Sequence, residues 1–425
     1  MKRKICVLLC ALLCAASVSG CDKKDNRGGE ASDTQANTAA VSAAEETDEN
    51  AVDPSVTFDL SAGVTDKMYN RALLSEGNTD RLAAAMEKAK SGEKITVAAI
   101  GGSITQGTAA SNSSGCYASL FFKWWQDKFP ECGINTVNAG IGGTDSYLGV
   151  HRADDQLLSY EPDVVVIEFS VNDTDAVMNK YSYDSLVRKV LSAENNPAVI
   201  LLFTTQENGT SLQDVHKEIG AAYGLPMISY REAVYPEVEA GTINWKDISP
   251  DNIHPNDVGH GIIGQLLSRY LDGVYASDTA AAAKNVTAFD AEGYTRDYYK
   301  NADLLNASEL ECELDGFEVG QNSVYTQFPE NWITSGGGTM KFETECQNLG
   351  ILLLKTTDGK SGKYEVFVDG ERKGAIDGDF SGGWGNYAYP QQVLFSTETE
   401  KHTVEIKPAE GSEDKGITIL AVMVS

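Results

Sequence analysis

The stretch KITVAAIGGSIT (residues 94–105) joins an apolar run to two glycines and a serine. Residues 94–100 form a short, mainly apolar run, as expected for a buried strand. Gly101 and Gly102 then allow a sharp turn, because glycine tolerates backbone conformations that other residues avoid. The strand would therefore place the hydroxyl of Ser103 at the edge of a sheet. There Ser103 could be a structural turn residue or a nucleophile.

The region from about residue 60 to 275 alternates between strand-like and helix-like segments. Further strands are expected within 133–142, 162–170, 196–205 and 225–230. Those at 162–170 and 196–205 are continuous apolar runs, typical of parallel strands buried on both faces. Helices are expected at 78–93, 115–129, 183–194, 211–223 and from His254 to about Tyr275. This alternation predicts an α/β domain, residues 59–278, with a parallel sheet covered by helices on both faces.

The hydrophobic pattern changes after about residue 285, where short segments of alternating apolar and polar residues replace the helical periodicity. Asp-Gly and Gly pairs between them, as in VFVDGERKG (366–374), indicate hairpins. We therefore expect a second, all-β domain at 285–425, a sandwich of jelly-roll type.

The amino-terminal segment has the features of a signal peptide. Lys2, Arg3 and Lys4 precede an apolar stretch that is too short for a confident membrane span. Val-Ser-Gly-Cys at 18–21 resembles the bacterial lipobox, so residues 1–21 are expected to form a lipoprotein signal whose cysteine, Cys21, is lipidated and becomes the new amino terminus. Residues 22–56 have almost no large apolar side chain, so a disordered acidic linker is expected over residues 22–58. The protein is then expected outside the cytoplasm, held to the membrane through its lipid alone.

Charge and cysteine usage exclude some classes of partner. The formal net charge of −28 argues against a nucleic-acid backbone or an anionic membrane surface as the main partner.

Cys116 and Cys132 flank an expected helix and are too far apart to form a disulfide, whereas a disulfide between Cys312 and Cys346 stays open. No Cys/His cluster has metal-ligand spacing, so no metal is expected.

Four short segments follow or approach the ends of the expected strands. GGSIT, NAGIGGTDS (138–146) and EFSVND (168–173) each close a strand, and DNIHPND (251–257) precedes the last helix. Because the carboxyl ends of parallel strands border one crevice, these loops are expected to converge.

The residues delivered to that crevice suit acyl transfer. His254 is a base for the Ser103 hydroxyl, and Asp251 can hold the other imidazole nitrogen. The N–H groups of Ser103 and Gly143 and the amide of Asn172 would supply donors for an oxyanion. Each motif alone is weak, but all four occur in one order where the topology would place them.

These segments resemble the four blocks of the SGNH (GDSL-like) hydrolase superfamily over residues 94–270 or so. The resemblance implies a flavodoxin-like three-layer α/β/α fold, Ser103 as nucleophile and Asp251 and His254 as the rest of a triad. It also implies Gly143 and Asn172 as oxyanion donors, and no cofactor. The sequence departs from the family at Gly102, where an acid is usual, which leaves open how the serine turn is braced.

The second domain suggests a substrate class. Trp384 lies among glycines and aromatics in DFSGGWGNYAYPQQ (379–392), where it would stack on a sugar ring or on a neighbouring domain. Jelly-roll partners of SGNH domains occur in carbohydrate esterases, so the architecture resembles that of an esterase that deacetylates an O-acetylated glycan. Two alternatives stay open: a lipase, lysophospholipase or thioesterase of the same superfamily, and a non-catalytic glycan-binding lipoprotein.

Overall fold

The computed structural model describes residues 48–55, 58–175 and 177–425. The expected signal peptide, Cys21 and the linker up to residue 47 lie outside the described residues. Asp48–Ser425 forms one compact unit. Within the described part of the chain, no helix is long and apolar enough to cross a membrane.

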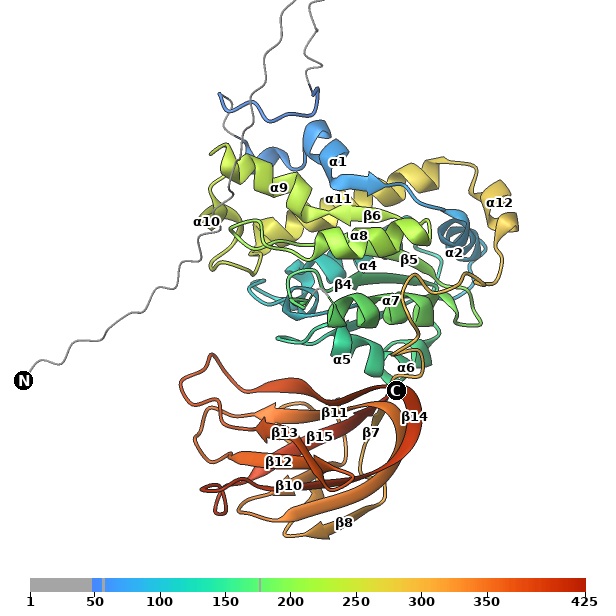
Figure 1. The fold of residues 1–425 in the computed structure, drawn as a ribbon. Helices are drawn as coiled ribbons and strands as arrows, with labels where there is room; N and C mark the ends of the chain where they lie inside the picture. The colour runs from blue at the N-terminus through green and yellow to red at the C-terminus, as the bar shows by residue number, and fades with distance from the viewer. Residues whose placement is uncertain (1–47, 56–57, 176) are drawn as a thin grey trace, which may run out of the picture. The chain divides into compact units, whose positions relative to one another are not determined.

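A six-stranded sheet lies at the centre of the first domain (Figure 1). Its strands, in chain order, are β1 (Leu73–Ser75), β2 (Ile95–Gly101), β3 (Ile134–Gly140), β4 (Val164–Glu168), β5 (Ala198–Phe203) and β6 (Met227–Ser229). Their spatial order is β1-β6-β5-β4-β2-β3. β2 to β6 are parallel, as the apolar runs predict, whereas β1 pairs antiparallel with β6 at one edge.

Helices connect these strands and follow the last of them. The described helices are α1 (Asp66–Ala72), α2 (Asp80–Lys90), α3 (Ser103–Gln106), α4 (Tyr117–Lys128), α5 (Ser146–His151), α6 (Ala153–Gln156), α7 (Met178–Leu191), α8 (Gln213–Ala222), α9 (Tyr230–Glu239), α10 (Trp245–Ile248), α11 (Asp257–Ala276) and α12 (Thr279–Ala282). Single 3₁₀ turns lie at Leu60–Ala62, Ser113–Gly115, Leu158–Tyr160 and Ala283–Asn285. Part of the expected linker contacts α1, where Arg71 Nη1 donates to the carbonyl of Asn50 at 2.7 Å.

Helices cover both faces of the sheet. Buried side chains of α2, α4 and α11 form one apolar core with the sheet, and those of α5, α7 and α8 form another. Alternate residues of β2 enter opposite cores, with Val97 and Ala99 in the first and Ala98 and Ile100 in the second. The strand is therefore buried on both faces and apolar apart from Thr96, and the predicted three-layer α/β/α fold is confirmed.

The second domain is a large antiparallel sheet, which confirms the expected all-β domain. Its strands are β7 (Asp303–Leu305), β8 (Cys312–Asp315), β9 (Glu318–Gly320), β10 (Asn331–Thr334), β11 (Thr339–Lys355), β12 (Lys363–Val368), β13 (Glu371–Asp377), β14 (Tyr387–Pro408) and β15 (Ile417–Val424). The main path runs β13-β12-β14-β11-β15-β10-β9, with β7 on β15 and β8 on β11. β11 and β14 pair along most of their length, with register shifts near Cys346 and Gly350. Such irregularities bend long strands around a core, and β14 is curved in Figure 1.

Both domains contribute to one apolar core. Tyr147 and Leu148 of α5 belong to the same buried cluster as Leu352 of β11 and Ala388 of β14. α5 directly follows the glycine loop that contains Gly143. The all-β domain therefore packs against the element that continues from the predicted oxyanion loop.

Candidate active site

Ser103 lies where β2 meets α3. β2 ends at Gly101, and Ser103 is the first residue of α3, with 7% of its surface exposed. The N–H of a first helical residue has no intrahelical acceptor, so that of Ser103 is available to a ligand. The strand, turn and short helix thus present both the hydroxyl and the N–H of this serine at the carboxyl edge of the sheet.

His254 and Asp251 reach the same point from the loop before α11. His254 Nε2 lies 2.9 Å from Ser103 Oγ, and His254 Nδ1 lies 2.8 Å from Asp251 Oδ2. Asp251 Oδ1 accepts hydrogen bonds from the backbone N–H groups of Ile253 at 2.8 Å and His254 at 2.7 Å. The structure thus brings together the serine, the base and the acid that the sequence predicts, in hydrogen-bonding contact.

The hydrogen bonds around Asp251 favour its ionised form. Partial burial acts to raise the pKa of Asp251, but the hydrogen bonds from the backbone and side chain of His254 outweigh it. The pKa of Asp251 therefore lies below its ordinary value. An ionised carboxylate at this position can hold a proton on Nδ1 of His254 and leave Nε2 free to accept one from Ser103.

Two side chains outside the predicted motifs hold the 251–254 loop. Trp245 Nε1 donates to the carbonyl of Asp251 at 2.6 Å. Ser249 Oγ contacts the carbonyls of Asp251 at 2.8 Å and His254 at 2.7 Å. These contacts fix the loop backbone, so the imidazole reaches Ser103 without help from a substrate.

The predicted oxyanion donors come from the loops after β3 and β4. Gly143 has a φ of 73°, which favours glycine, and it precedes α5. The side chain of Asn172 lies against the serine turn: a Cβ on Gly102 would fall 2.1 Å from Asn172 Oδ1. Asn172 therefore borders the turn that carries Ser103. In the loop after β3 it is Gly142, next to Gly143, that faces Ser103: a Cβ on Gly142 would lie 3.8 Å from Ser103 Cβ.

The contact with Asn172 explains why residue 102 is glycine. No side chain fits between the serine turn and the Asn172 amide, since Asn172 Cγ would also lie within 2.6 Å of the added Cβ. The Oδ1 atom of Asn172 is buried without a hydrogen-bond partner among the described residues. Packing against Gly102 therefore sets the orientation of this amide.

Other groups brace the serine turn in place of the acid. Arg152, which is fully buried, donates from Nη2 to the carbonyl of Gly101 at 3.1 Å. Asn138 Nδ2 donates to the carbonyl of Thr105 at 2.8 Å and so joins the loop after β3 to α3. Burial lowers the pKa of Arg152 to about 9, because it disfavours the charged guanidinium. The contact of this buried side chain with the Gly101 carbonyl indicates that it holds the serine turn in place.

A buried carboxyl lies beneath α3. Glu168 ends β4, pairs in register with Gly101, and is fully buried. It accepts hydrogen bonds from Thr204 Oγ1 at 2.6 Å and from Thr105 Oγ1 at 3.2 Å. Burial raises the pKa of Glu168 to about 7 against the opposing effect of these hydrogen bonds.

Trp384 of the all-β domain reaches the oxyanion loop. A Cβ on Gly143 would lie 3.2 Å from Trp384 Cη2 and Cζ2, and 3.5 Å from Tyr387 Cδ2. The Trp384 ring is 68% exposed and packs on Tyr387, with 4.9 Å between ring centroids. The structure therefore places this predicted aromatic beside the predicted catalytic residues.

The remaining histidines and cysteines lie in other surroundings. His260, His151, His216 and His402 are all buried. The Nδ1 atom of His260 accepts from the Tyr117 N–H at 3.3 Å, so this histidine joins α11 to the start of α4. Each of the four cysteines within the described residues, Cys116, Cys132, Cys312 and Cys346, is a free thiol.

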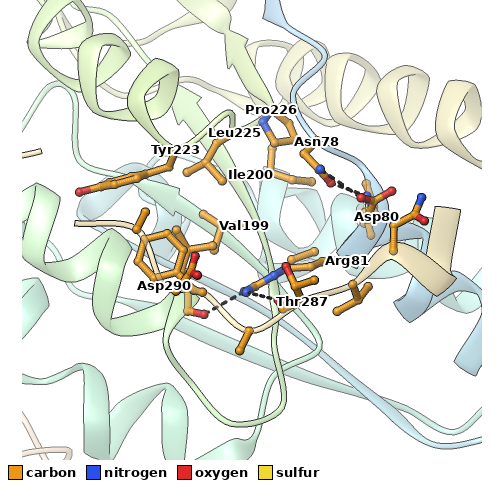
Figure 2. Close-up of a pocket in the computed structure, with 18 of the residues that line it drawn as sticks. Asn78, Asp80, Arg81, Val199, Ile200, Tyr223, Leu225, Pro226, Thr287 and Asp290 are labelled. Atoms are coloured by element: carbon orange, nitrogen blue, oxygen red, sulfur yellow. Dashed lines mark hydrogen bonds between the residues drawn. The ribbon is translucent and has the colours of Figure 1, made fainter. Parts of the chain in front are cut away.

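A cavity of about 250 Å³ lies at the opposite edge of the same sheet (Figure 2). Val199 and Ile200, at the start of β5, form part of its wall. Arg81 in this cavity donates to the carbonyls of Leu191 at 2.9 Å and Thr287 at 3.1 Å. No serine, cysteine or histidine is among the described residues that line it, so it offers none of the nucleophiles or bases found at the carboxyl edge.

The comparisons with known proteins agree with this geometry. Residues 99–262 match the family described as the GDSL-like Lipase/Acylhydrolase family. A two-domain esterase active on acetylated mannans is similar over 84% of this chain and 98% of its own, with a TM-score of 0.78 and 33% identity. A structure of such an esterase co-crystallized with mannopentaose is similar over 84% of this chain and 97% of its own, with a TM-score of 0.76 and 32% identity. No curated protein matches the sequence significantly.

The fold, the four loops and these similarities define the class of this protein. It belongs to the GDSL-like lipase/acylhydrolase (SGNH) family, as its sequence motifs predict. It is an esterase of that family, and its similarity to the two-domain esterases extends over both of its domains.

The packing of Asn172 on Gly102 predicts that Gly102→Ala impairs turnover. The added methyl would displace the Asn172 amide and misplace one oxyanion donor, so kcat should fall about 100-fold with KM little changed. Steady-state kinetics on 4-nitrophenyl acetate measure this. The control is Gly273→Ala in α11, where a Cβ meets nothing within 4 Å, and it should leave kcat unchanged. Full activity of Gly102→Ala would contradict the account.

The raised pKa of Glu168 predicts a pH-dependent effect of Glu168→Gln on stability. The folded-state pKa of about 7 exceeds the ordinary value of 4.5, so ionising the buried carboxyl destabilises the wild type as pH rises through that range. Glutamine cannot ionise: its Oε1 can accept from one threonine hydroxyl and its Nε2 can donate to the other. It should raise the free energy of unfolding relative to wild type by about 3 kcal/mol near pH 9 but not near pH 4. Thermal unfolding at both pH values measures this, and a difference independent of pH would contradict it.

Proposed function

We propose that this esterase removes O-acetyl groups from a polysaccharide through an acyl-enzyme on Ser103. The single observation that supports this most is the contact chain from Ser103 Oγ through His254 to Asp251, with distances of 2.9 and 2.8 Å. The substrate class is inferred from similarity over both domains to two-domain esterases active on acetylated mannans.

In the first half of the proposed cycle, Ser103 Oγ attacks the ester carbonyl carbon. His254 Nε2 takes the hydroxyl proton, and the ionised Asp251 stabilises the resulting imidazolium through Nδ1. The negative carbonyl oxygen of the tetrahedral intermediate accepts from the N–H groups of Ser103 and Gly143 and from the amide of Asn172. The imidazolium then protonates the departing sugar hydroxyl, which leaves an acetyl group on Ser103.

In the second half, water attacks this acyl-enzyme. His254 Nε2 accepts a proton from the water, and the same three donors stabilise the second tetrahedral intermediate. Its collapse releases acetate and returns the proton to Ser103 Oγ. None of these steps requires a metal or an organic cofactor.

We infer that the all-β domain forms one wall of the substrate site. Its exposed Trp384 ring lies against Gly143, so a sugar carrying the reacting ester would pass beside an aromatic face. Aromatic faces suit the apolar face of a sugar ring. This position favours stacking on substrate over the alternative that Trp384 only anchors its own loop.

A lipase or thioesterase role for the same active site is the second candidate class. Trp384 and Tyr387 both crowd Gly143, which favours a small acyl group over a long chain. The non-catalytic alternative conflicts with the hydrogen-bonded Ser103, His254 and Asp251.

The location is also a proposal. The Val-Ser-Gly-Cys segment supports lipidation of Cys21 and a place outside the cytoplasm, where an acetylated glycan would be accessible. Metabolic labelling with a palmitate analogue should mark the wild type and not Cys21→Ala.

Acyl-chain preference and acetate release test the proposed reaction. We expect turnover of 4-nitrophenyl esters to be fastest for the two-carbon acyl chain, and acetate to be released from acetylated mannan in preference to acetylated xylan or peptidoglycan. Ser103→Ala should lose activity by at least about 10³-fold, since the nucleophile is absent. Preference for long acyl chains would support the lipase class, and full activity of Ser103→Ala would overturn the mechanism.

Removal of the Trp384 ring tests the role of the all-β domain. Trp384→Ala should lower kcat/KM on acetylated mannan by about 10-fold, the loss expected from about 1.4 kcal/mol of stacking. The effect on 4-nitrophenyl acetate, which carries no sugar, should be smaller. The control is Tyr160→Ala, a 56% exposed aromatic before the start of β4 at the other edge of the sheet. Equal effects of the two variants would contradict the stacking role.

A further inference from the structure

Asp173 is a buried carboxylate that no step of the proposed reaction uses. It directly follows Asn172, and its side chain is fully buried. Its Oδ1 atom accepts from the N–H of Ser146 at 2.7 Å. Ser146 begins α5, three residues after Gly143. One carboxylate therefore joins the loop that carries the Asn172 amide to the loop that carries the Gly143 N–H.

A buried histidine holds the other oxygen of this carboxylate. His216 Nε2, on α8, lies 2.9 Å from Asp173 Oδ2. The imidazole stacks on the Tyr183 ring of α7, with 3.6 Å between centroids and 2° between planes. The Nδ1 atom is buried without a hydrogen-bond partner among the described residues. An unpaired buried N–H is costlier than an unpaired acceptor, so the ring proton belongs on Nε2, directed at Asp173.

The Asp173 carboxylate has a second buried carboxyl group as its neighbour, and the two repel each other. The Asp145 carboxyl lies close enough that burial and the charge of Asp173 together raise the pKa of Asp145 to about 6. Removing one of two neighbouring buried carboxylates would relieve this repulsion. Asp173 is nonetheless held by two hydrogen bonds from separate elements, which indicates a positional purpose.

We propose that Asp173 is a positioning residue that sets the spacing between the two oxyanion donors outside the serine turn, and that His216 orients it. The inference rests on the proposed function, because it assigns Gly143 and Asn172 as donors. Donors must be placed within a fraction of an ångström of the developing oxyanion to be effective. The Asn172 Oδ1 atom has no hydrogen-bond partner among the described residues, and the side chain of the adjacent Asp173 joins this loop to the start of α5.

Two substitutions of Asp173 in the full chain test this. Asp173→Ala removes both hydrogen bonds and should lower kcat by about 10–100-fold while KM changes less than about two-fold. Asp173→Asn keeps an acceptor for the Ser146 N–H, but its Nδ2 can donate to His216 Nε2 only if the ring proton moves to the unpartnered Nδ1. Its kcat should lie between those of the wild type and Asp173→Ala.

The matched control is Asp184→Asn on α7. Asp184 is also fully buried, and its Oδ2 atom accepts from the N–H of Thr295 at 2.9 Å, but none of its hydrogen bonds reaches an oxyanion loop. It should lower the melting temperature and leave kcat unchanged. Loss of kcat in Asp184→Asn equal to that in Asp173→Asn would show that destabilisation alone explains the effect, and would overturn the proposal.

A double-mutant cycle of Asp173→Ala and Asn172→Ala tests whether Asp173 acts by positioning Asn172 or independently of it. If Asp173 acts partly through Asn172, Asp173→Ala should cost less in an Asn172→Ala background than in the wild type. Equal costs in the two backgrounds would overturn the proposal, as would a folded Asp173→Ala enzyme with wild-type kcat. Inactivity of the wild type on every acetyl ester would instead overturn the proposed function, so the two failures are distinguishable.

Discussion

The contact between Ser103 Oγ and His254 Nε2 is the constraint on which the rest of the site depends. It joins a turn after the second strand of the sheet to a loop that precedes the last long helix, 151 residues later in the chain. In this parallel sheet the carboxyl ends of the strands lie at one edge, which brings these segments together with the loops after β3 and β4. The buried strands therefore serve the chemistry by fixing where four loops end.

Buried polar groups lie beneath that contact. They hold the serine turn, α3 and the start of α5 in place, and burying them costs folding free energy. Arg152 holds the carbonyl of Gly101, Glu168 accepts from Thr105 in α3, and Asp173 holds the N–H at the start of α5. Burial shifts the pKa of Arg152 down and that of Glu168 up, because it disfavours the charged form of each group. Enzymes commonly accept such costs where a preorganised site is needed.

The sequence predicted the parts of this architecture that local patterns encode. Apolar runs located β2 to β6, and the residue types around Ser103, Gly143, Asn172 and His254 located the candidate site. β1 was missed because three residues show no periodicity, and α9 because Pro236 lies inside it. Asp173 and His216 were not identified from the sequence, because the contacts that join Ser146, Asp173 and His216 exist only in the folded chain. The acid missing at residue 102 was explained only when the Asn172 amide was found against that glycine.

The central claim is that Ser103 is a nucleophile activated by His254. Diethyl 4-nitrophenyl phosphate tests it directly, because an activated serine forms a P–O bond through Oγ as 4-nitrophenolate leaves. Mass spectrometry of the labelled, digested protein should find the diethylphosphoryl group on the peptide that contains Ser103, and labelling should be lost in His254→Ala. An unmodified Ser103 after complete exposure, or undiminished labelling without His254, would contradict the account.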